Sequence, residues 1–230
     1  MPDITIAGKD GDFSAYLASP ASGTGPGILV IQEIFGVNKD MRDHCDGLAK
    51  QGYFALSPDL FWRQEPGVQI TDKTDAEWQK AFQLYQGFSV DKGIEDLQAS
   101  LRHLRTIKGC TGKAGTVGFC LGGLLAYLMA TRSDADGNVG YYGVGIDGKL
   151  DEAARITKPL MLHIAEEDKF VSKDAQKTIK AGLAGNAKVT VYSYPGADHA
   201  FARHNGVHYH QASAELASRR TAEFFKAHLS

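Results

Sequence analysis

The sequence has few cysteines and no excess of basic residues. Its 230 residues include only 3 Cys, and 25 Lys+Arg against 27 Asp+Glu give a formal net charge of −2. Nucleic-acid binding needs a basic surface to neutralise phosphates, so this balance argues against a nucleic-acid partner. The cysteines form no CxxC pair, which argues against a disulfide framework or a structural zinc site and favours a reducing, cytoplasmic setting.

Long apolar runs and linkers are also missing. The longest apolar stretch, residues 124–130, is far shorter than the ~20 residues of a membrane-spanning helix, so no membrane partner is expected. The first residues carry no apolar core of a signal peptide, so secretion is not predicted. Because no repeat or linker divides the chain, which is 43% hydrophobic, we predict one domain over residues 1–230.

Short apolar runs alternate with longer amphipathic patterns. Asn38 and Ser89 stand where helix N-caps are expected. The runs predict strands at residues 27–34, 53–57, 115–119, 139–144, 159–164 and 188–194, and helices at 39–51, 90–109, from 121, 172–184 and from 211. This alternation predicts an α/β fold, a mostly parallel sheet with helices on both faces. Ligands bind such sheets at the carboxyl ends of the strands.

Residues 118–122 (GFCLG) lie between a predicted strand and a predicted helix, a position typical of a nucleophile elbow. Cysteine stands where serine is usual. Flanking glycines permit the tight turn, and the helix N-terminus favours the thiolate, so we predict Cys120 as a nucleophile. The alternative is that Cys120 is a small buried apolar residue. Cys45 lies on the apolar face of the helix at 39–51 and is predicted to be in the core, while Cys110 follows a turn.

In this type of fold the acid and the histidine follow the nucleophile in that order. Asp168 follows the strand at 159–164, and His199 follows the strand at 188–194. We predict that His199 shuttles the proton and Asp168 orients it. The competing acids are Glu166, Glu167, Asp174 and Asp198. His163 is predicted to be a core residue. The remaining histidines of that region match no standard zinc spacing, so no metal is predicted: His204, His208 and His210.

An oxyanion formed at the reacting carbon needs two N–H donors. The backbone N–H of Leu121, directly after the nucleophile, is the first predicted donor. The second is expected from the loop after the first buried strand, at Ile34.

Five separated motifs carry a family resemblance: QEIFGVN at 32–38, QGY and PDL within 51–60, GFCLGG at 118–123, GYYGVG at 140–145 and HAFAR at 199–203. Together they resemble the dienelactone hydrolases (carboxymethylenebutenolidases). The resemblance implies a monomeric α/β-hydrolase of about eight strands that uses no cofactor. It also implies a small-molecule substrate, dienelactone, opened to maleylacetate during chloroaromatic breakdown.

The resemblance also implies roles for further residues. Glu33 matches a glutamate that contacts the resting thiol and takes its proton when substrate binds. Physically, a carboxylate beside Cys120 disfavours a second anion and keeps the thiol protonated. The alternative for Glu33 is an ordinary loop carboxylate. Arg203 matches an arginine that binds the substrate carboxylate, and its guanidinium suits that group. Tyr141 matches a pocket tyrosine.

The chain departs from the family pattern at Trp78 and Phe82, which stand where the family has a second arginine and a tyrosine. A more apolar pocket follows, which suits a bulkier or uncharged ester or lactone. Trp78, Phe82 and Tyr85 share one helix face. That stripe is either core packing or a pocket wall.

These observations predict a hydrolase that cleaves an ester or enol-lactone through a thiol. A carboxylesterase or thioesterase on the same three residues is the first alternative. A non-catalytic small-molecule-binding module is the second, although it would not need all three residues. A redox sensor at Cys120 is the third. The sensor predicts a low thiol pKa at rest, whereas the role of Glu33 predicts a largely neutral thiol.

Overall fold

The structure is a computed structural model that describes residues 3–229. The described residues form an eight-stranded sheet with the order β1-β2-β4-β3-β5-β6-β7-β8. Pairs β3–β4, β6–β7 and β7–β8 are parallel, and pairs β1–β2 and β2–β4 are antiparallel. The strands are β1 (Asp3–Ala7), β2 (Asp12–Ala18), β3 (Gly25–Ile31), β4 (Phe54–Pro58), β5 (Cys110–Phe119), β6 (Asn138–Tyr141), β7 (Leu160–Ala165) and β8 (Val189–Tyr194).

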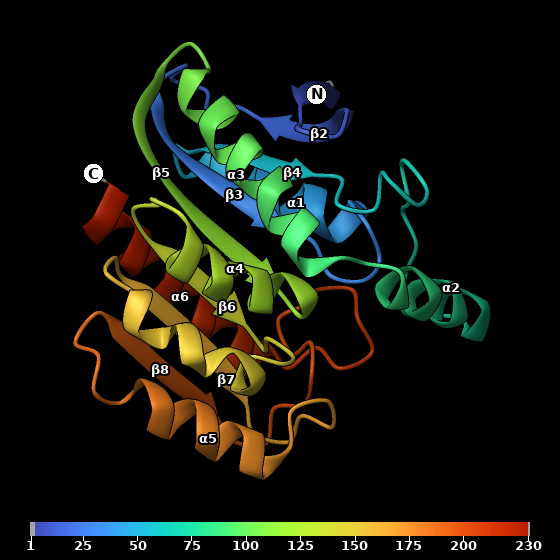
Figure 1. Ribbon diagram of the computed structural model, residues 1–230, viewed down its shortest axis with the longest axis vertical. Helices are drawn as coiled ribbons and strands as arrows, with labels where there is room; N and C mark the ends of the chain where they lie inside the picture. The colour runs from blue at the N-terminus through green and yellow to red at the C-terminus, as the bar shows by residue number, and fades with distance from the viewer. Residues whose placement is uncertain (1–2, 230) are drawn as a thin grey trace. The chain divides into compact units, whose positions relative to one another are not determined.

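Six α-helices and one 3-10 helix connect the described strands. They are α1 (Lys39–Lys50), α2 (Asp75–Gln86), α3 (Val90–Thr106), α4 (Leu121–Arg132), the 3-10 helix η1 (Asp147–Arg155), α5 (Lys173–Leu183) and α6 (Gln211–Leu229). The mostly parallel sheet with helices confirms the predicted fold class (Figure 1). No helix within residues 3–229 has the length and apolar character needed to cross a membrane.

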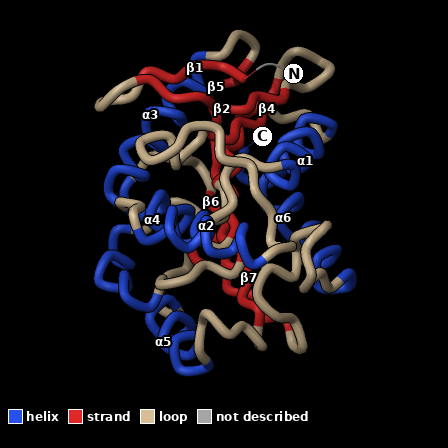
Figure 2. Tube along the Cα trace, turned by 90° about the vertical axis from the view of Figure 1, so that its right-hand side faces the viewer, coloured by secondary structure: helices blue, strands red, loops and turns tan. Residues whose placement is uncertain are grey.

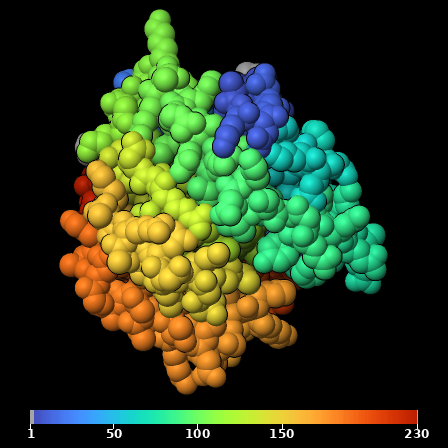
Figure 3. All heavy atoms as spheres, in the orientation of Figure 1, coloured from blue at the N-terminus to red at the C-terminus, as the bar shows by residue number. Residues whose placement is uncertain are grey.

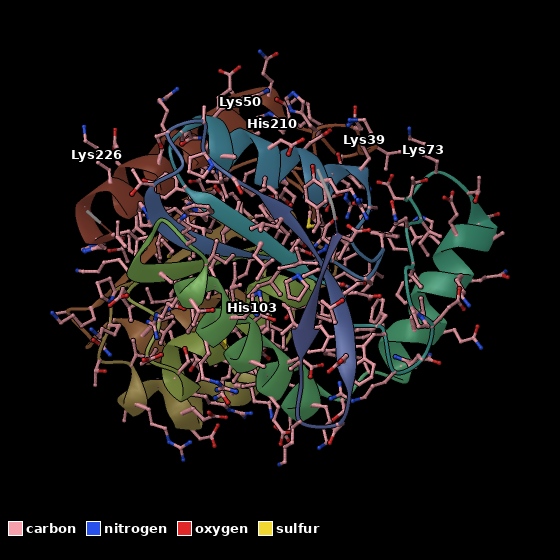
Figure 4. The ribbon with its side chains drawn as sticks, turned by 90° about the horizontal axis from the view of Figure 1, so that it is seen from above. Lys39, Lys50, Lys73, His103, His210 and Lys226 are labelled. Atoms are coloured by element: carbon pink, nitrogen blue, oxygen red, sulfur yellow. The ribbon has the colours of Figure 1, made fainter. Side chains whose placement is uncertain are left out.

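The chain divides into two compact units, with unit 1 ending at Thr116 and unit 2 beginning at Val117. The expectation of one domain stays a prediction. In unit 1, α1 and α3 pack on opposite sides of its strands (Figure 2). The predicted caps are confirmed, because Asn38 accepts a hydrogen bond from the N–H of Met41 and Ser89 accepts one from Lys92. Lys39 and Lys50 mark the two ends of α1 (Figure 4).

Unit 1 also contains the hairpin β1–β2, which the apolar runs did not predict. Its strand β2 alternates exposed and buried residues at its start, as expected of a strand with one face toward solvent. Continuous apolar runs mark strands that are buried on both faces, so such a pattern does not predict this one.

In unit 2, α4 and α5 lie on one side of the strands and α6 on the other (Figure 2). Helix α4 is buried from Leu121 through Thr131. Strand β6 ends at Tyr141, three residues before the predicted end, because Tyr142 has a positive φ of 38° and leaves the extended conformation. The carboxylate of Glu152 in η1 pairs with Arg132 at the end of α4 at 2.5 Å, which lowers the pKa of Glu152 to about 2.

Candidate active site

The turn from β5 into α4 is built around Cys120. This residue has φ 55° and ψ −114°, a strained conformation for a residue with a side chain. The N–H of Cys120 donates to the carbonyl of Tyr141 at 3.1 Å. A Cβ at Gly118 would overlap the carbonyl of Gly122, and one at Gly123 would overlap the carbonyl of Tyr141. These two glycines therefore permit the close backbone approach that the tight turn requires.

Helix α4 places partial positive charge beside the Cys120 sulfur. Leu121 and Gly122 are the first residues of the helix, so their N–H groups have no intrahelical acceptor. Such a helix N-terminus stabilises an anion. The predicted nucleophile and the predicted donor Leu121 thus lie at one helix end. Only 9% of the surface of Cys120 is exposed.

His199 and Asp168 meet in unit 2. His199 Nδ1 lies 2.7 Å from Asp168 Oδ2, and both side chains are buried. The other carboxylate oxygen, Oδ1, accepts hydrogen bonds from the N–H groups of Phe170 and Val171 at 2.8 and 3.3 Å. Main-chain donors therefore hold the aspartate while it faces the imidazole.

The competing acids lie elsewhere. Asp198 Oδ1 accepts from the backbone N–H of its neighbour His199 at 2.7 Å, not from the ring. Glu167 is exposed and pairs with Lys173 at 3.0 Å. Asp174 is at the surface, with 93% of its side chain exposed. Among the described carboxylates, the one that faces the His199 ring is Asp168.

The charge state of His199 depends on its partners. Burial disfavours the imidazolium, but Cys120 and Asp168 outweigh burial and raise the pKa of His199 to about 10. Cys120 is also hydrogen-bonded to His199. The rings of Tyr142 and Phe170 contact the imidazole edge-on, with centroids 5.1 and 4.8 Å away. The charge of a Cys120 thiolate is the largest of the effects that raise the pKa of His199, so the imidazolium is favoured once the thiol has lost its proton.

The other histidines of this region, between residues 163 and 210, have structural partners. His163 lies in β7 with 1% of its surface exposed, which confirms the prediction of a core residue. His204 packs against Tyr209, whereas His208 faces Asp198 and His210 bonds Ser213. His210 lies at the edge of the structure in Figure 4. Within residues 3–229, no group of three or more His, Cys, Asp or Glu side chains is arranged to hold a metal ion.

The predicted residues of unit 1 follow the end of β3. Glu33 and Ile34 are buried, with 2% and 6% of their surface exposed. The side-chain amide of Gln32 donates to the Glu33 carbonyl at 3.3 Å and accepts from the N–H of Leu60 at 3.0 Å. These two bonds fix the backbone of the loop after β3. Cys45 is fully buried on α1, which confirms its predicted place in the core.

The aromatic stripe lies on α2, at the surface of unit 1 (Figure 3). Phe82 and Tyr85 are 40% and 39% exposed, so core packing is the wrong interpretation for these two residues. Trp78 is partly buried, stacks on Phe82 at 5.5 Å and contacts Phe35 edge-on at 5.1 Å. The stripe is thus an aromatic surface that continues into the loop after β3.

The two residues of unit 2 that are predicted to bind substrate, Arg203 and Tyr141, have different surroundings. Arg203 is buried, and its side chain lies so close to Gly206 that a Cβ there would meet its carbon atoms. Tyr141 is also buried, but its hydroxyl lies 2.6 Å from Thr221 Oγ1 inside the unit. The Tyr141 hydroxyl therefore has a protein partner, and its contact with substrate stays a prediction. Thr221 could not be predicted from motifs, because no local pattern marks a lone threonine on a helix.

Comparisons with known proteins identify the family of the chain. The model of the dienelactone hydrolase family matches residues 13–229. The chain belongs to the dienelactone hydrolase family. A protein of Azospirillum brasilense is 56% identical over 232 residues, with 100% of each sequence covered. The carboxymethylenebutenolidase of Pseudomonas putida is 38% identical over 222 residues, covering 96% of this chain and 94% of its own.

Solved structures give the same result. A crystal structure from Klebsiella pneumoniae subsp. pneumoniae MGH 78578 has a TM-score of 0.86 at 27% identity, covering 98% of this chain and 97% of its own. Family membership confirms the resemblance derived from the five motifs. It also confirms the assignment of the chain to a family of hydrolases that act on esters or lactones.

Proposed function

We propose that this protein hydrolyses an ester or enol-lactone with Cys120 as the nucleophile, His199 as the acid and base, and Asp168 as the orienting group. The observation that carries the proposal is the arrangement inside unit 2. Cys120 stands at the elbow with φ 55°, is hydrogen-bonded to His199, and His199 in turn meets Asp168 at 2.7 Å. A binding module without catalysis has no use for this set of groups.

The chemistry divides into two steps. In the reacting state Cys120 is a thiolate and His199 an imidazolium. Cys120 Sγ bonds to the carbonyl carbon, the ester C–O bond breaks, and the leaving oxygen takes the proton of His199. A water molecule then gives a proton to His199 and attacks the thioester carbon. The C–S bond breaks, which releases the acid and restores the thiolate–imidazolium pair. In a lactone the leaving oxygen stays attached to the acyl group, so ring opening gives a single product.

The remaining roles are also part of this proposal. Leu121 N–H stabilises the oxyanion from the start of α4, and Ile34 N–H is the second donor. Glu33 controls the protonation of the thiol. Its support is its buried position in the loop after β3 and the match of that loop to the family motif. The chain is free of disulfides at Cys45, Cys110 and Cys120, which supports a reducing, cytoplasmic setting.

The substrate class follows from Arg203, Trp78 and Phe82. Arg203 provides one guanidinium for a carboxylate, as in the breakdown of dienelactone from chloroaromatic compounds. The exposed Phe82 stacked on Trp78 favours an aromatic or apolar substituent instead. That aromatic surface also supports the second candidate, a carboxylesterase or thioesterase that uses the same three residues.

The function is tested by Cys120→Ala with two substrates, cis-dienelactone and a neutral p-nitrophenyl ester. We expect turnover of both to fall by at least about 10⁴-fold, because the nucleophile is lost while the turn tolerates a small side chain. Cys110→Ala is the matched control and should keep wild-type rates. Turnover by Cys120→Ala at the wild-type rate would reject the proposal.

The substrate class is tested by Trp78→Arg, which restores the charge that the family pattern has at this position. We expect kcat/KM for cis-dienelactone to rise roughly tenfold, since a charged pair with the substrate carboxylate adds about 1–2 kcal/mol. The rate on the neutral p-nitrophenyl ester should not rise. If a folded variant gains nothing on the carboxylate substrate, Trp78 does not line the pocket.

A further inference from the structure

A chain of buried polar groups runs through unit 2 behind the reacting residues. Its centre is Thr221 on α6, whose Oγ1 lies 3.1 Å from His163 Nε2 and 2.6 Å from the Tyr141 hydroxyl. His163 Nδ1 lies 2.7 Å from the Tyr194 hydroxyl. At the outer end, Arg220 Nη1 donates to the Tyr194 hydroxyl at 3.2 Å. The described elements β6, β7, β8 and α6 each contribute to this chain.

The direction of the hydrogen bonds follows from the chemistry of the donors. Arg220 always donates, so the Tyr194 oxygen accepts and its own O–H is available for His163 Nδ1. His163 is buried, and burial together with Arg220 lowers its pKa to about 3, so the ring is neutral. With Tyr194 donating to Nδ1, the ring proton is on Nε2. That N–H then donates to Thr221. The Thr221 hydroxyl is hydrogen-bonded to both Tyr141 and His163. These bonds fix the orientation of each ring in this hydrogen-bonded chain.

Two arms connect this chain to the reacting groups. The first is Tyr141, whose carbonyl accepts from the N–H of Cys120 at 3.1 Å and whose ring packs on Phe119 at 4.9 Å. The second is Tyr142, whose N–H donates to the carbonyl of His163 at 2.8 Å and whose ring contacts the imidazole of His199. Tyr141 and Tyr142 are adjacent, so one segment touches both the nucleophile and the base.

We propose that Thr221 is a positioning residue, which through Tyr141 and His163 fixes the segment that holds Cys120 and His199 at their working separation. This proposal rests on the proposed function and adds to it residues that touch no substrate. Regular pairing of β6 with β7 ends at Tyr141, and Tyr142, with a positive φ, lies just beyond it. Side-chain bonds from α6 and β7 hold the segment where the strand pairing stops.

The test is Thr221→Val, which keeps the shape of the side chain and removes both hydrogen bonds. A small shift of a reacting atom costs rate, so we expect kcat to fall about tenfold with KM within about twofold. Alkylation of Cys120 by iodoacetamide, followed on its own peptide by mass spectrometry, should slow by a similar factor. Thr221→Ser, which keeps the hydroxyl, should restore most of both rates.

Thr131→Val is the matched control. Thr131 is a buried threonine of α4 in the same unit. Its hydroxyl lies 3.1 Å from the carbonyl oxygen of Leu128 and 3.1 Å from the carboxylate Oε2 of Glu152. We expect this variant to lose stability comparably while both rates stay within about twofold. The proposal is overturned if Thr221→Val keeps wild-type kcat and alkylation, or if Thr131→Val loses as much. Failure of the proposed function is separate, because it would appear as full turnover in Cys120→Ala.

Discussion

His163 and His199 both lie in unit 2, with 1% and 5% of their surface exposed. Burial alone would keep either ring neutral, and for His163 it does, with a pKa of about 3. His199 differs because Cys120 and Asp168 raise its pKa to about 10 despite the burial. The Nδ1 atoms of the two rings meet a tyrosine hydroxyl and a carboxylate respectively, both at 2.7 Å.

The comparison shows that the partner, and not the depth, decides whether a buried imidazole carries charge. A hydroxyl can accept or donate, so it accommodates a neutral ring at no electrostatic cost. A carboxylate accepts only, so it favours a proton on the ring. The same residue type therefore serves as a structural connector at β7 and as a proton carrier after β8.

The largest expected effect comes from removing Asp168, which together with Cys120 makes the two rings differ. Asp168→Asn should lower kcat/KM by on the order of 10⁴-fold, because the amide no longer stabilises the imidazolium or selects its tautomer. The pKa of His199, measured by NMR, should fall well below about 10. Asp198→Asn is the matched control and should cost no more than roughly fivefold, since the amide oxygen can still accept from the His199 N–H and only the charge that faces His208 is lost. A normal rate in Asp168→Asn would show that the carboxylate is not what distinguishes His199 from His163.

A smaller effect is expected from the charge state of the thiol. Glu33→Gln should lower kcat by about 10–100-fold, as for loss of a group that moves a proton. If Glu33 holds the resting thiol neutral, the same variant should alkylate faster with iodoacetamide at pH 7. Glu65→Gln, at a half-exposed carboxylate of unit 1, should change neither rate. Unchanged kcat would remove Glu33 from the mechanism. Unchanged alkylation would show that His199 alone determines the fraction of Cys120 that is thiolate.

The smallest effect is on stability. The pKa of His163 is about 3 in the folded protein and near 6.5 when unfolded, so the unfolded chain binds the proton more tightly. The contribution of His163 to folding stability is therefore complete above about pH 6.5 and falls with decreasing pH, by up to about 1.4 kcal/mol for each pH unit below it. Urea unfolding between pH 7 and 4.5 should show a shallower fall in His163→Gln, which cannot titrate. Parallel curves for the two proteins would mean that His163 is protonated inside the fold.

The parts predicted from sequence are those with a local cause. The Gly-x-Cys-x-Gly turn, the caps at Asn38 and Ser89, and the position of Asp168 after a strand each depend on neighbouring residues. The positioning residue Thr221 did not emerge, because its partners at 141 and 163 are distant in sequence. For the same reason Tyr141 was expected at the substrate, whereas its hydroxyl is held inside unit 2. Local patterns identify the reacting groups, and long-range contacts define what holds them.

Asp168 is anchored through the main-chain N–H groups of Phe170 and Val171, not through their side chains. Any amino acid except proline supplies the same donors at those positions. The exposed Phe170 can therefore change its side chain while Asp168 keeps its orientation, whereas Val171 is buried. Phe170 is half exposed and lies beside the imidazole of His199. Substitutions at Phe170 can therefore change the surroundings of the reacting bond without displacing His199.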